Sequence, residues 1–382
     1  MNGSEAAAAQ VLIRELPARR GCRIGIATLN APRSLNALTL AMIRRLAATL
    51  RLWARDPEIV CVVLEGMGER AFCAGGDVRS LRDVILAYTG PAPNPWAQEF
   101  FVEEYRLDYL IHRFPKPLVV WGSGAVMGGG LGLMAGASHR VVTETSRLAM
   151  PEISIGLYPD VGASWFLRRL PSHMGLFLAL TGAPLDGADA RVAGLADAFV
   201  AASQRQAVLE AVAVVDWTQS VASNHDRLRE ALCSPEIAAT QAQPVCNVQR
   251  YSATIERVLQ GRNLEQVAEQ LATLKDHESP WLAAAAATFE AGSPRSAALV
   301  WEIWRRARDL SLADVFRMEL VLSLQCCAQP DLVEGVRALL VDRDRKPRWE
   351  PGTLAEVSPA LIEEYFSPPW AERVVQALRD LV

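Results

Sequence analysis

Apolar residues near the start of the chain follow two spacings, one typical of strands and one typical of helices. Residues 23–29 and 60–65 are short apolar runs that include β-branched side chains, which predicts two strands. Between them, residues 38–53 carry apolar side chains at helical intervals, which predicts an amphipathic helix. The first 70 residues therefore fit the order strand, strand, helix, strand.

The alternation of helix and strand continues to about residue 143. Helices are predicted over residues 81–86 and 100–114, and the second is ended by two prolines. Strands are predicted over residues 118–121 and 140–143, with a glycine turn and a helix between them. This recurring order predicts a layered α/β architecture.

The pattern changes beyond residue 186, where strand-like runs become scarce. Alanine-rich amphipathic segments separated by prolines dominate residues 205–328. We therefore expect an α/β catalytic core over residues 1–200 and a mainly helical region over residues 201–382.

Composition excludes several classes of protein. A net charge of −4 gives no electrostatic basis for binding nucleic acid or an anionic membrane. No run reaches the roughly 18 apolar residues of a membrane span, and the first ten residues do not resemble a secretory signal. Seven scattered cysteines without a C-x-x-C pair argue against a disulfide framework or a zinc site, and the five histidines lack ligand spacing. We expect a cytoplasmic protein, and the excess of arginine over lysine points to a bacterial source.

A first glycine loop, Arg70-Ala-Phe-Cys-Ala-Gly-Gly-Asp77, follows the predicted strand at 60–65. Small residues there would allow a ligand to approach the main chain closely, and N–H groups at a helix start favour negative charge. The alternative is an ordinary turn between a strand and a helix.

A second glycine loop, Gly122-Ser-Gly-Ala-Val-Met-Gly-Gly-Gly-Leu-Gly132, again lies between a predicted strand and helix. Two such loops could each supply one N–H group, which together would form an oxyanion hole. The segment Gly130-Leu-Gly-Leu-Met-Ala135 also fits the dinucleotide fingerprint G-x-G-x-x-A. The position of its strand, far from the N-terminus, and the lack of an acid ending the next strand make that alternative weaker.

The third segment, Met150-Pro-Glu-Ile-Ser-Ile-Gly-Leu-Tyr-Pro-Asp-Val-Gly162, holds two acids in apolar surroundings. Its prolines and glycine exclude one continuous helix from Glu152 to Asp160, so both acids are predicted on a folded-back loop. Apolar surroundings raise carboxylate pKa values and make acid–base chemistry available near neutral pH. Asp160 could instead cap a helix predicted at 161–170.

Taken together, these segments resemble the crotonase (enoyl-CoA hydratase/isomerase) superfamily. The matching residues are Ala31-Pro-Arg-Ser-Leu-Asn-Ala-Leu38, Ala71-Phe-Cys-Ala-Gly-Gly-Asp77, Met127-Gly-Gly-Gly-Leu-Gly132 and Pro151-Glu152. The resemblance implies a spiral of β-β-α units followed by a C-terminal α-helical region. It implies an acyl-CoA substrate whose thioester carbonyl lies between the N–H groups of Ala74 and Gly129, with Gly75 and Gly76 also against the substrate.

Two positions distinguish this chain from hydratases of that superfamily. Hydratases carry a catalytic glutamate two residues after the glycine triplet, where this chain has Gly132, and a glycine where it has Asp160. Glu152 fits their second glutamate. The chain is more similar to the branch that hydrolyses 3-hydroxyisobutyryl-CoA in valine breakdown. The further segments that support this are Glu103-Glu104-Tyr105, Ser293-Pro-Arg-Ser296 and Glu334-Gly-Val-Arg-Ala-Leu-Leu-Val-Asp342.

The resemblance implies a role for each acid. Glu152 would attack the carbonyl directly or activate water, Asp160 would bind the substrate hydroxyl or handle a proton, and Glu104 would line the acyl pocket. No cofactor or metal is expected beyond the coenzyme A of the substrate. Two other hypotheses remain, an enoyl-CoA hydratase or isomerase and a non-catalytic binding scaffold. Trimers are common in the superfamily, and the sequence leaves the oligomeric state open.

Overall fold

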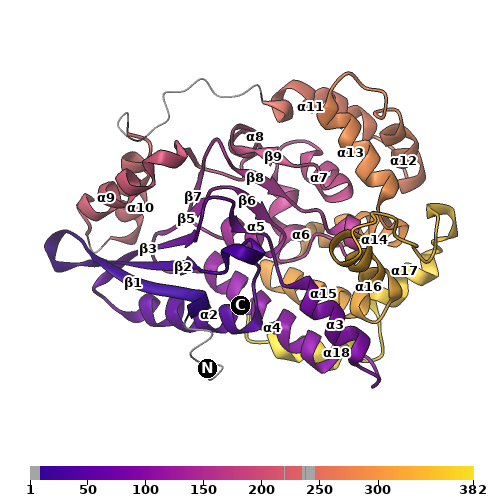
Figure 1. Ribbon diagram of the computed structural model, residues 1–382, viewed down its shortest axis with the longest axis horizontal. Coiled ribbons are helices and arrows are strands. Elements are labelled where there is room, and N and C mark those ends of the chain that lie inside the picture. Colours follow the sequence, from indigo (N-terminus) through magenta and orange to yellow (C-terminus); the bar gives the residue numbers. More distant parts are fainter. Residues whose placement is uncertain (1–8, 219, 235–236, 238–245) are drawn as a thin grey trace. The chain divides into compact units, whose positions relative to one another are not determined.

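The layered α/β architecture predicted from the first 143 residues is present. The computed structural model describes residues 9–218, 220–234, 237 and 246–382 (Figure 1). A six-stranded sheet has the order β1-β2-β3-β5-β7-β10, in which β1 and β2 are antiparallel and the other pairs are parallel. Its strands are β1 (Val11–Pro17), β2 (Arg23–Leu29), β3 (Ile59–Gly66), β5 (Leu118–Gly122), β7 (His139–Val142) and β10 (Ala198–Phe199).

A second, smaller sheet consists of strands that the hydrophobic pattern did not predict. Its order is β4-β6-β8-β9. The strands are β4 (Ala71–Cys73), β6 (Ala125–Met127), β8 (Arg147–Ala149) and β9 (Leu185–Asp186). Each has only two or three residues, which is too short for a period-two pattern to be recognised. Two of them, β4 and β6, lie inside the glycine segments and pair in parallel.

The chain folds as two units, each assembled from separate segments. The first unit comprises residues 1–76, 107–148 and 185–249, and the second comprises 77–106, 149–184 and 250–382. This division differs from the predicted boundary near residue 200, because two segments from the first half of the chain pack with the C-terminal helices. After β10 every described regular element is helical, as expected from the sequence.

In the first unit, helices cover the six-stranded sheet. Its helices are α2 (Leu40–Arg55), the end of α4 (Pro95–His112), α5 (Gly129–Ala135), α8 (Gly187–Ala193), α9 (Arg205–Val214) and α10 (Val221–Leu232). Alternate residues of neighbouring strands, such as Ile24 and Ile26 or Val119 and Trp121, point to one face and pack with α9 and α10. The predicted helix at 38–53 is α2, and its N-cap Thr39 accepts a hydrogen bond from the N–H of Met42.

The second unit is almost entirely helical. Its helices are α3 (Val78–Ala87), the first part of α4, α6 (Ala163–Phe166), α7 (Met174–Thr181), most of α11 (Asn247–Val258), α12 (Leu264–Ala272), α13 (Pro280–Ala291), α14 (Pro294–Arg306), α15 (Leu312–Cys327), α16 (Pro330–Val336), α17 (Pro359–Phe366) and α18 (Ala371–Val375). Most residues of α15 are buried, which is typical of a helix surrounded by others.

A tight backbone contact joins α16 to the loop that carries the two predicted acids. A Cβ atom added to Gly156 would lie 2.4 Å from the carbonyl carbon of Asp331, and one added to Gly335 would lie 2.5 Å from that of Ile155. Gly156 also has a φ of +72°, which side-chain-bearing residues rarely adopt. Glycine is therefore required on both sides of this contact.

Gly156→Ala should destabilise the protein more than Gly194→Ala. Both glycines have positive φ, but a Cβ at Gly194 would meet nothing within 4 Å. The left-handed conformation alone should cost about 1–2 kcal/mol in each variant. At Gly156, overpacking against α16 should add about 1–3 kcal/mol. Urea unfolding measures both free energies, and equal losses in the two variants would contradict the contact.

Candidate active site

The two glycine loops lie side by side in the first unit. Because β4 and β6 are parallel neighbours, the loops that follow them leave the sheet at the same edge. A Cβ atom added to Gly75 would lie 3.4 Å from the backbone nitrogen of Gly129, and one added to Gly130 would lie 2.2 Å from the carbonyl oxygen of Cys73. At position 130 only glycine allows the two main chains to approach this closely.

One predicted oxyanion donor needs correction. The N–H of Ala74 donates to the carbonyl oxygen of Leu35 at 3.0 Å, so it is not free to bind a substrate. Gly75, with a φ of +99°, turns the chain immediately afterwards. Within the described part of the chain, the N–H groups of Gly75 and Gly76 have no acceptor. Gly129 is the first residue of α5, so its N–H has no partner inside the helix.

The three predicted carboxylic acids come together in the second unit. Glu152 opens a short 3₁₀ helix, Glu152–Ile155, that ends at the left-handed Gly156. Asp160 lies on the turn that follows, and Glu104 lies on α4. All three side chains are buried, at 3–5% exposure. The sequence therefore identified the acids, and the fold brings Glu104 to the other two.

Burial changes the acidity of all three groups. It raises the pKa of Glu152 and of Glu104 well above the ordinary value, and the nearby charge of Asp160 raises both further. Burial also raises the pKa of Asp160 to about 6, although a hydrogen bond from Tyr105 opposes this effect. One oxygen of Glu152, Oε2, has no hydrogen-bond partner in the described structure. A buried carboxyl group with an unused oxygen is suited to accept a proton or to attack an electrophile.

Asp160 does not cap the helix that follows it. The N-cap of α6 is Gly162, a residue without a side chain to cap the helix. The side chain of Asp160 instead accepts a hydrogen bond of 2.7 Å from the hydroxyl of Tyr105. The structural alternative that the sequence left open for Asp160 is therefore wrong.

Two residues of α15 complete the surroundings of Asp160, and the sequence analysis missed both. The carboxylate of Glu319 accepts hydrogen bonds from the N–H groups of Gly162 at 2.7 Å and Ser164 at 3.1 Å. Burial raises the pKa of Glu319 to about 8, and these bonds oppose the rise. Ser323 lies one turn further along α15, on the same face. An acid and a serine four residues apart in the otherwise apolar stretch 318–324 were the signal that could have revealed them.

The turn after Asp160 is strained. Val161 has a φ of 52°, a left-handed conformation that is uncommon for a β-branched residue. Such a conformation costs about 1–3 kcal/mol and persists where its surroundings hold it in place. The two N–H groups bound by Glu319 belong to Gly162 and Ser164, one and three residues after this strained position.

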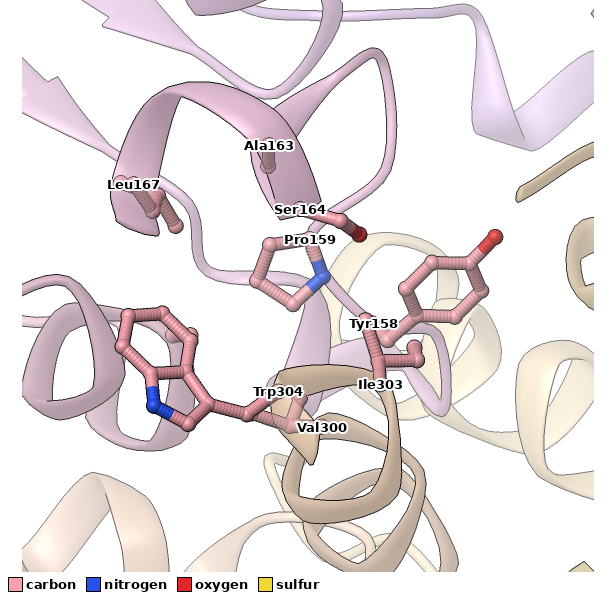
Figure 2. A pocket seen from close by; sticks show the side chains of 9 residues that line it. Tyr158, Pro159, Ala163, Ser164, Leu167, Val300, Ile303 and Trp304 are labelled. Carbon is pink, nitrogen blue, oxygen red and sulfur yellow. The ribbon is translucent and has the colours of Figure 1, made fainter. Parts of the chain in front are cut away.

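The other side of the turn faces an apolar pocket of about 20 Å³, enough for one water molecule. Figure 2 shows Pro159 beside the side chains of α14, with the hydroxyl of Tyr158 directed away from Trp304. The lining residues are Tyr158, Pro159, Ala163, Ser164, Leu167, Ala179, Val300, Ile303 and Trp304. The turn therefore has polar partners on the side of α15 and apolar partners on the side of α14.

The segment Ser293–Ser296 forms hydrogen bonds with the acid-bearing loop and with the C-terminal region. The N–H of Ser293 donates to the carbonyl of Ile153 at 3.0 Å, and its hydroxyl donates to Asp331 at 2.6 Å. Asp331 also accepts the N–H of Glu350 at 3.0 Å. Arg295, which is buried, donates to the hydroxyl of Tyr365 at 2.9 Å. The residue next to Glu152 is thus bonded to Ser293 and, through Ser293, to Asp331 of α16.

Neither a metal cluster nor a membrane span is found in the described part of the chain. Its His, Cys, Asp and Glu side chains form no group of three or more arranged to hold a metal ion. None of the described helices has the length and apolar character needed to cross a bilayer.

Comparison with known proteins identifies the family. The family model described as enoyl-CoA hydratase/isomerase matches residues 24–366. The chain belongs to the enoyl-CoA hydratase/isomerase family. Two curated relatives are the mitochondrial 3-hydroxyisobutyryl-CoA hydrolases of Danio rerio and Homo sapiens. The first is 39% identical over 345 residues, which is 90% of this chain and 87% of that protein. The second is 35% identical over 360 residues, which is 94% of this chain and 89% of that protein.

Solved structures of the same family carry different titles. A carnitinyl-CoA dehydratase from Mycobacterium thermoresistibile is 37% identical, with a TM-score of 0.80 over 94% of this chain and 96% of that one. An enoyl-CoA hydratase from Rhodobacter sphaeroides is 34% identical, with a TM-score of 0.79 over 94% of this chain and 98% of that one. The family and the crotonase fold are therefore established, whereas the choice between hydrolysis and hydration rests on the site residues.

Asp160→Asn should stabilise the protein at high pH. Because the pKa of Asp160 is raised from 3.8 to about 6 on folding, the folded state binds more protons than the unfolded state between these values. Stability is therefore lost as the pH rises through this window. Asparagine does not ionise. The free energy of unfolding of the variant should therefore exceed that of the wild type by about 1–3 kcal/mol at pH 8, and the two should converge below pH 4.

Urea unfolding at the two pH values measures this difference. The control is Glu69→Gln, which changes an exposed acid and should alter stability by less than about 0.5 kcal/mol. An Asp160→Asn variant that is less stable than the wild type at pH 8 would contradict the stated effect of burial.

Proposed function

We propose that this protein hydrolyses the thioester of a short 3-hydroxyacyl-CoA, with 3-hydroxyisobutyryl-CoA as the substrate. The products would be 3-hydroxyisobutyrate and coenzyme A, a step in valine breakdown. The observation that carries this proposal is the pairing of buried Glu152 and Asp160 in one loop while position 132 is glycine. The names of curated relatives that match about nine-tenths of the chain support it.

In this mechanism the glycine loops stabilise the oxyanion. The N–H of Gly129 and an N–H from Gly75 or Gly76 would bind the carbonyl oxygen as it becomes negative. Preorganised donors of this kind contribute about 3–4 kcal/mol each to the transition state. These donors bind the negative oxygen of the transition state more strongly than the neutral carbonyl of the bound thioester. They therefore lower the barrier to attack.

The acids supply the attack and the proton transfers. Glu152 either attacks the carbonyl carbon to give a mixed anhydride or removes a proton from the attacking water. Asp160, with its pKa near 6, can exchange a proton near neutral pH and protonate the departing thiolate. Glu104 would line the acyl pocket beside them. The reaction needs no cofactor other than the coenzyme A carried by the substrate.

Hydration of an enoyl-CoA is the second candidate, because two solved structures above 30% identity bear hydratase or dehydratase titles. Adding water across a double bond in this family normally uses two glutamates. One of their positions is occupied here by Gly132, a buried residue of α5. An enzyme acting by hydration would have to rely on Glu152 and Asp160 instead.

An assay with two substrates separates these candidates. We expect the protein to release free thiol from 3-hydroxyisobutyryl-CoA and to leave the enoyl absorbance of crotonyl-CoA unchanged. Free thiol is measured with a thiol reagent. Loss of the enoyl absorbance without any thiol release would reject the hydrolase and support the hydratase. Rates on other short 3-hydroxyacyl-CoA thioesters would define the acyl preference.

Glu152→Gln should lower kcat for thiol release by about 10²–10⁴-fold, because the amide can neither attack nor accept the proton. The matched pair Glu104→Gln and Glu103→Gln compares the buried acid of α4 with its less buried neighbour. A substrate-lining role predicts a higher KM for Glu104→Gln than for Glu103→Gln. Undiminished turnover by Glu152→Gln would remove Glu152 from the mechanism.

A further inference from the structure

We propose that Ser323 is a positioning residue for Asp160, whose hydroxyl turns between Tyr105 and Tyr158 as Asp160 gains and loses its proton. This inference rests on the proposed function, in which Asp160 exchanges a proton during thioester cleavage. It concerns residues of the second unit alone. Ser323 does not touch Asp160 itself but acts through Tyr105.

Five oxygen atoms form a continuous chain from Asp160 into α15. The Tyr105 hydroxyl lies 2.7 Å from Oδ2 of Asp160 and 2.7 Å from Oγ of Ser323. Oγ of Ser323 lies 2.9 Å from the Tyr158 hydroxyl, which donates to the main-chain carbonyl of Glu319 at 2.7 Å. All five residues are buried. The chain therefore contains four short contacts between oxygen atoms.

The number of protons in this chain depends on the state of Asp160. Each of the three hydroxyls supplies one proton, and a carbonyl oxygen can only accept. When Asp160 is ionised, three protons serve four contacts, so one contact stays without a hydrogen. When Asp160 is protonated, four protons serve four contacts, and every contact becomes a hydrogen bond.

The two fixed ends leave the empty contact on one side of Ser323. With Asp160 ionised, Tyr105 donates to the carboxylate and Tyr158 donates to the carbonyl of Glu319. Ser323 then donates to Tyr105, because its proton is directed toward the negative charge of Asp160, and its contact with Tyr158 is the empty one. With Asp160 protonated, Asp160 donates to Tyr105, Tyr105 to Ser323, and Ser323 to Tyr158. The two states therefore differ in the directions of two hydroxyls.

This rearrangement conserves protons during the proposed reaction. When Asp160 gives its proton to the sulfur of the departing thiolate, the S–H bond forms and the Asp160 O–H bond breaks. Tyr105 then turns its proton to the new carboxylate, and Ser323 turns its own from Tyr158 to Tyr105. No hydroxyl proton leaves the chain. In the mixed-anhydride route, the water that hydrolyses the anhydride gives one proton to Asp160 and its hydroxide to the acyl carbon, which frees Glu152 and restores the protonated arrangement.

Other titratable groups also face Asp160, and they must stay constant in any test. They come from α4, from the 3₁₀ helix before the turn, from the turn itself and from α15. These groups are Glu104, Tyr105, Glu152, Tyr158, Glu319, Cys326 and Cys327. The informative variants therefore remove hydroxyls and leave all the carboxyl groups in place.

The two variants should shift the titration of Asp160 in opposite directions, Ser323→Ala through the number of hydrogen bonds and Tyr105→Phe through loss of the bond that stabilises the charge. Ser323→Ala removes two hydrogen bonds from the protonated state but one from the ionised state, so Asp160 should titrate at lower pH. Tyr105→Phe removes the donor to the carboxylate and should make Asp160 titrate at higher pH. Each shift should be roughly half to one pH unit, the size of one net hydrogen bond.

NMR of the full-length protein labelled with ¹³C-aspartate measures this titration without turnover, and Asp160→Asn assigns the signal. The pH profile of kcat/KM for thiol release from 3-hydroxyisobutyryl-CoA should shift in the same directions. Ser323→Thr restores a hydroxyl and should restore both readouts. Tyr365→Phe removes a buried hydroxyl outside the oxygen chain and should shift neither.

Opposite shifts in Ser323→Ala and Tyr105→Phe would support the proposal, and shifts in the same direction or none in Ser323→Ala would overturn it. If Ser323→Ala does not fold by circular dichroism, Tyr158→Phe replaces it. That variant also removes one more hydrogen bond from the protonated state than from the ionised state. Asp160 should therefore titrate at lower pH in this variant too. If the wild type releases no thiol, the proposed function fails, while the NMR titration still decides the role of Ser323.

Discussion

The burial of three carboxyl groups within one small region is the constraint on which the second unit depends. Burial disfavours the charged form of each, and the charge of Asp160 further disfavours ionisation of Glu104 and Glu152. Apolar residues at these positions would give a more stable protein. The partners of Asp160 show how its charge is tolerated, since Tyr105 donates directly to it. The net effect raises the pKa of Asp160 to about 6, close to neutral pH.

The C-terminal helices fix the position of the loop that carries Glu152 and Asp160. On one side α15 binds the turn after Asp160 and holds Val161 in its left-handed conformation through the neighbouring N–H groups. On another side α16 meets the main chain at Gly156 so closely that no side chain fits. Ser293 donates its N–H to the carbonyl of Ile153 in the same loop. The helical region therefore determines where the acids lie.

The proposed mechanism requires two kinds of chemistry that place different demands on the chain. Its oxyanion donors would be backbone N–H groups, which require glycine and close parallel strands rather than a particular side chain. The acids require burial and a fixed orientation. Glycine at 132 and aspartate at 160 leave the glycine loops unchanged, but they alter which acids are present.

The sequence by itself determined the long elements and the identity of the acids. The segments at 23–29 and 38–53 form β2 and α2, because a period of two or of 3.6 persists over several residues. The strands β4 and β6 are too short to show a period, so only their pairing reveals them. The sequence placed an oxyanion donor at Ala74, but hydrogen bonding to Leu35 is a tertiary property and excludes it. Likewise, Glu319 and Ser323 lie more than 150 residues from Asp160 along the chain. Only packing of α15 against the turn, which no local pattern encodes, brings them to that acid.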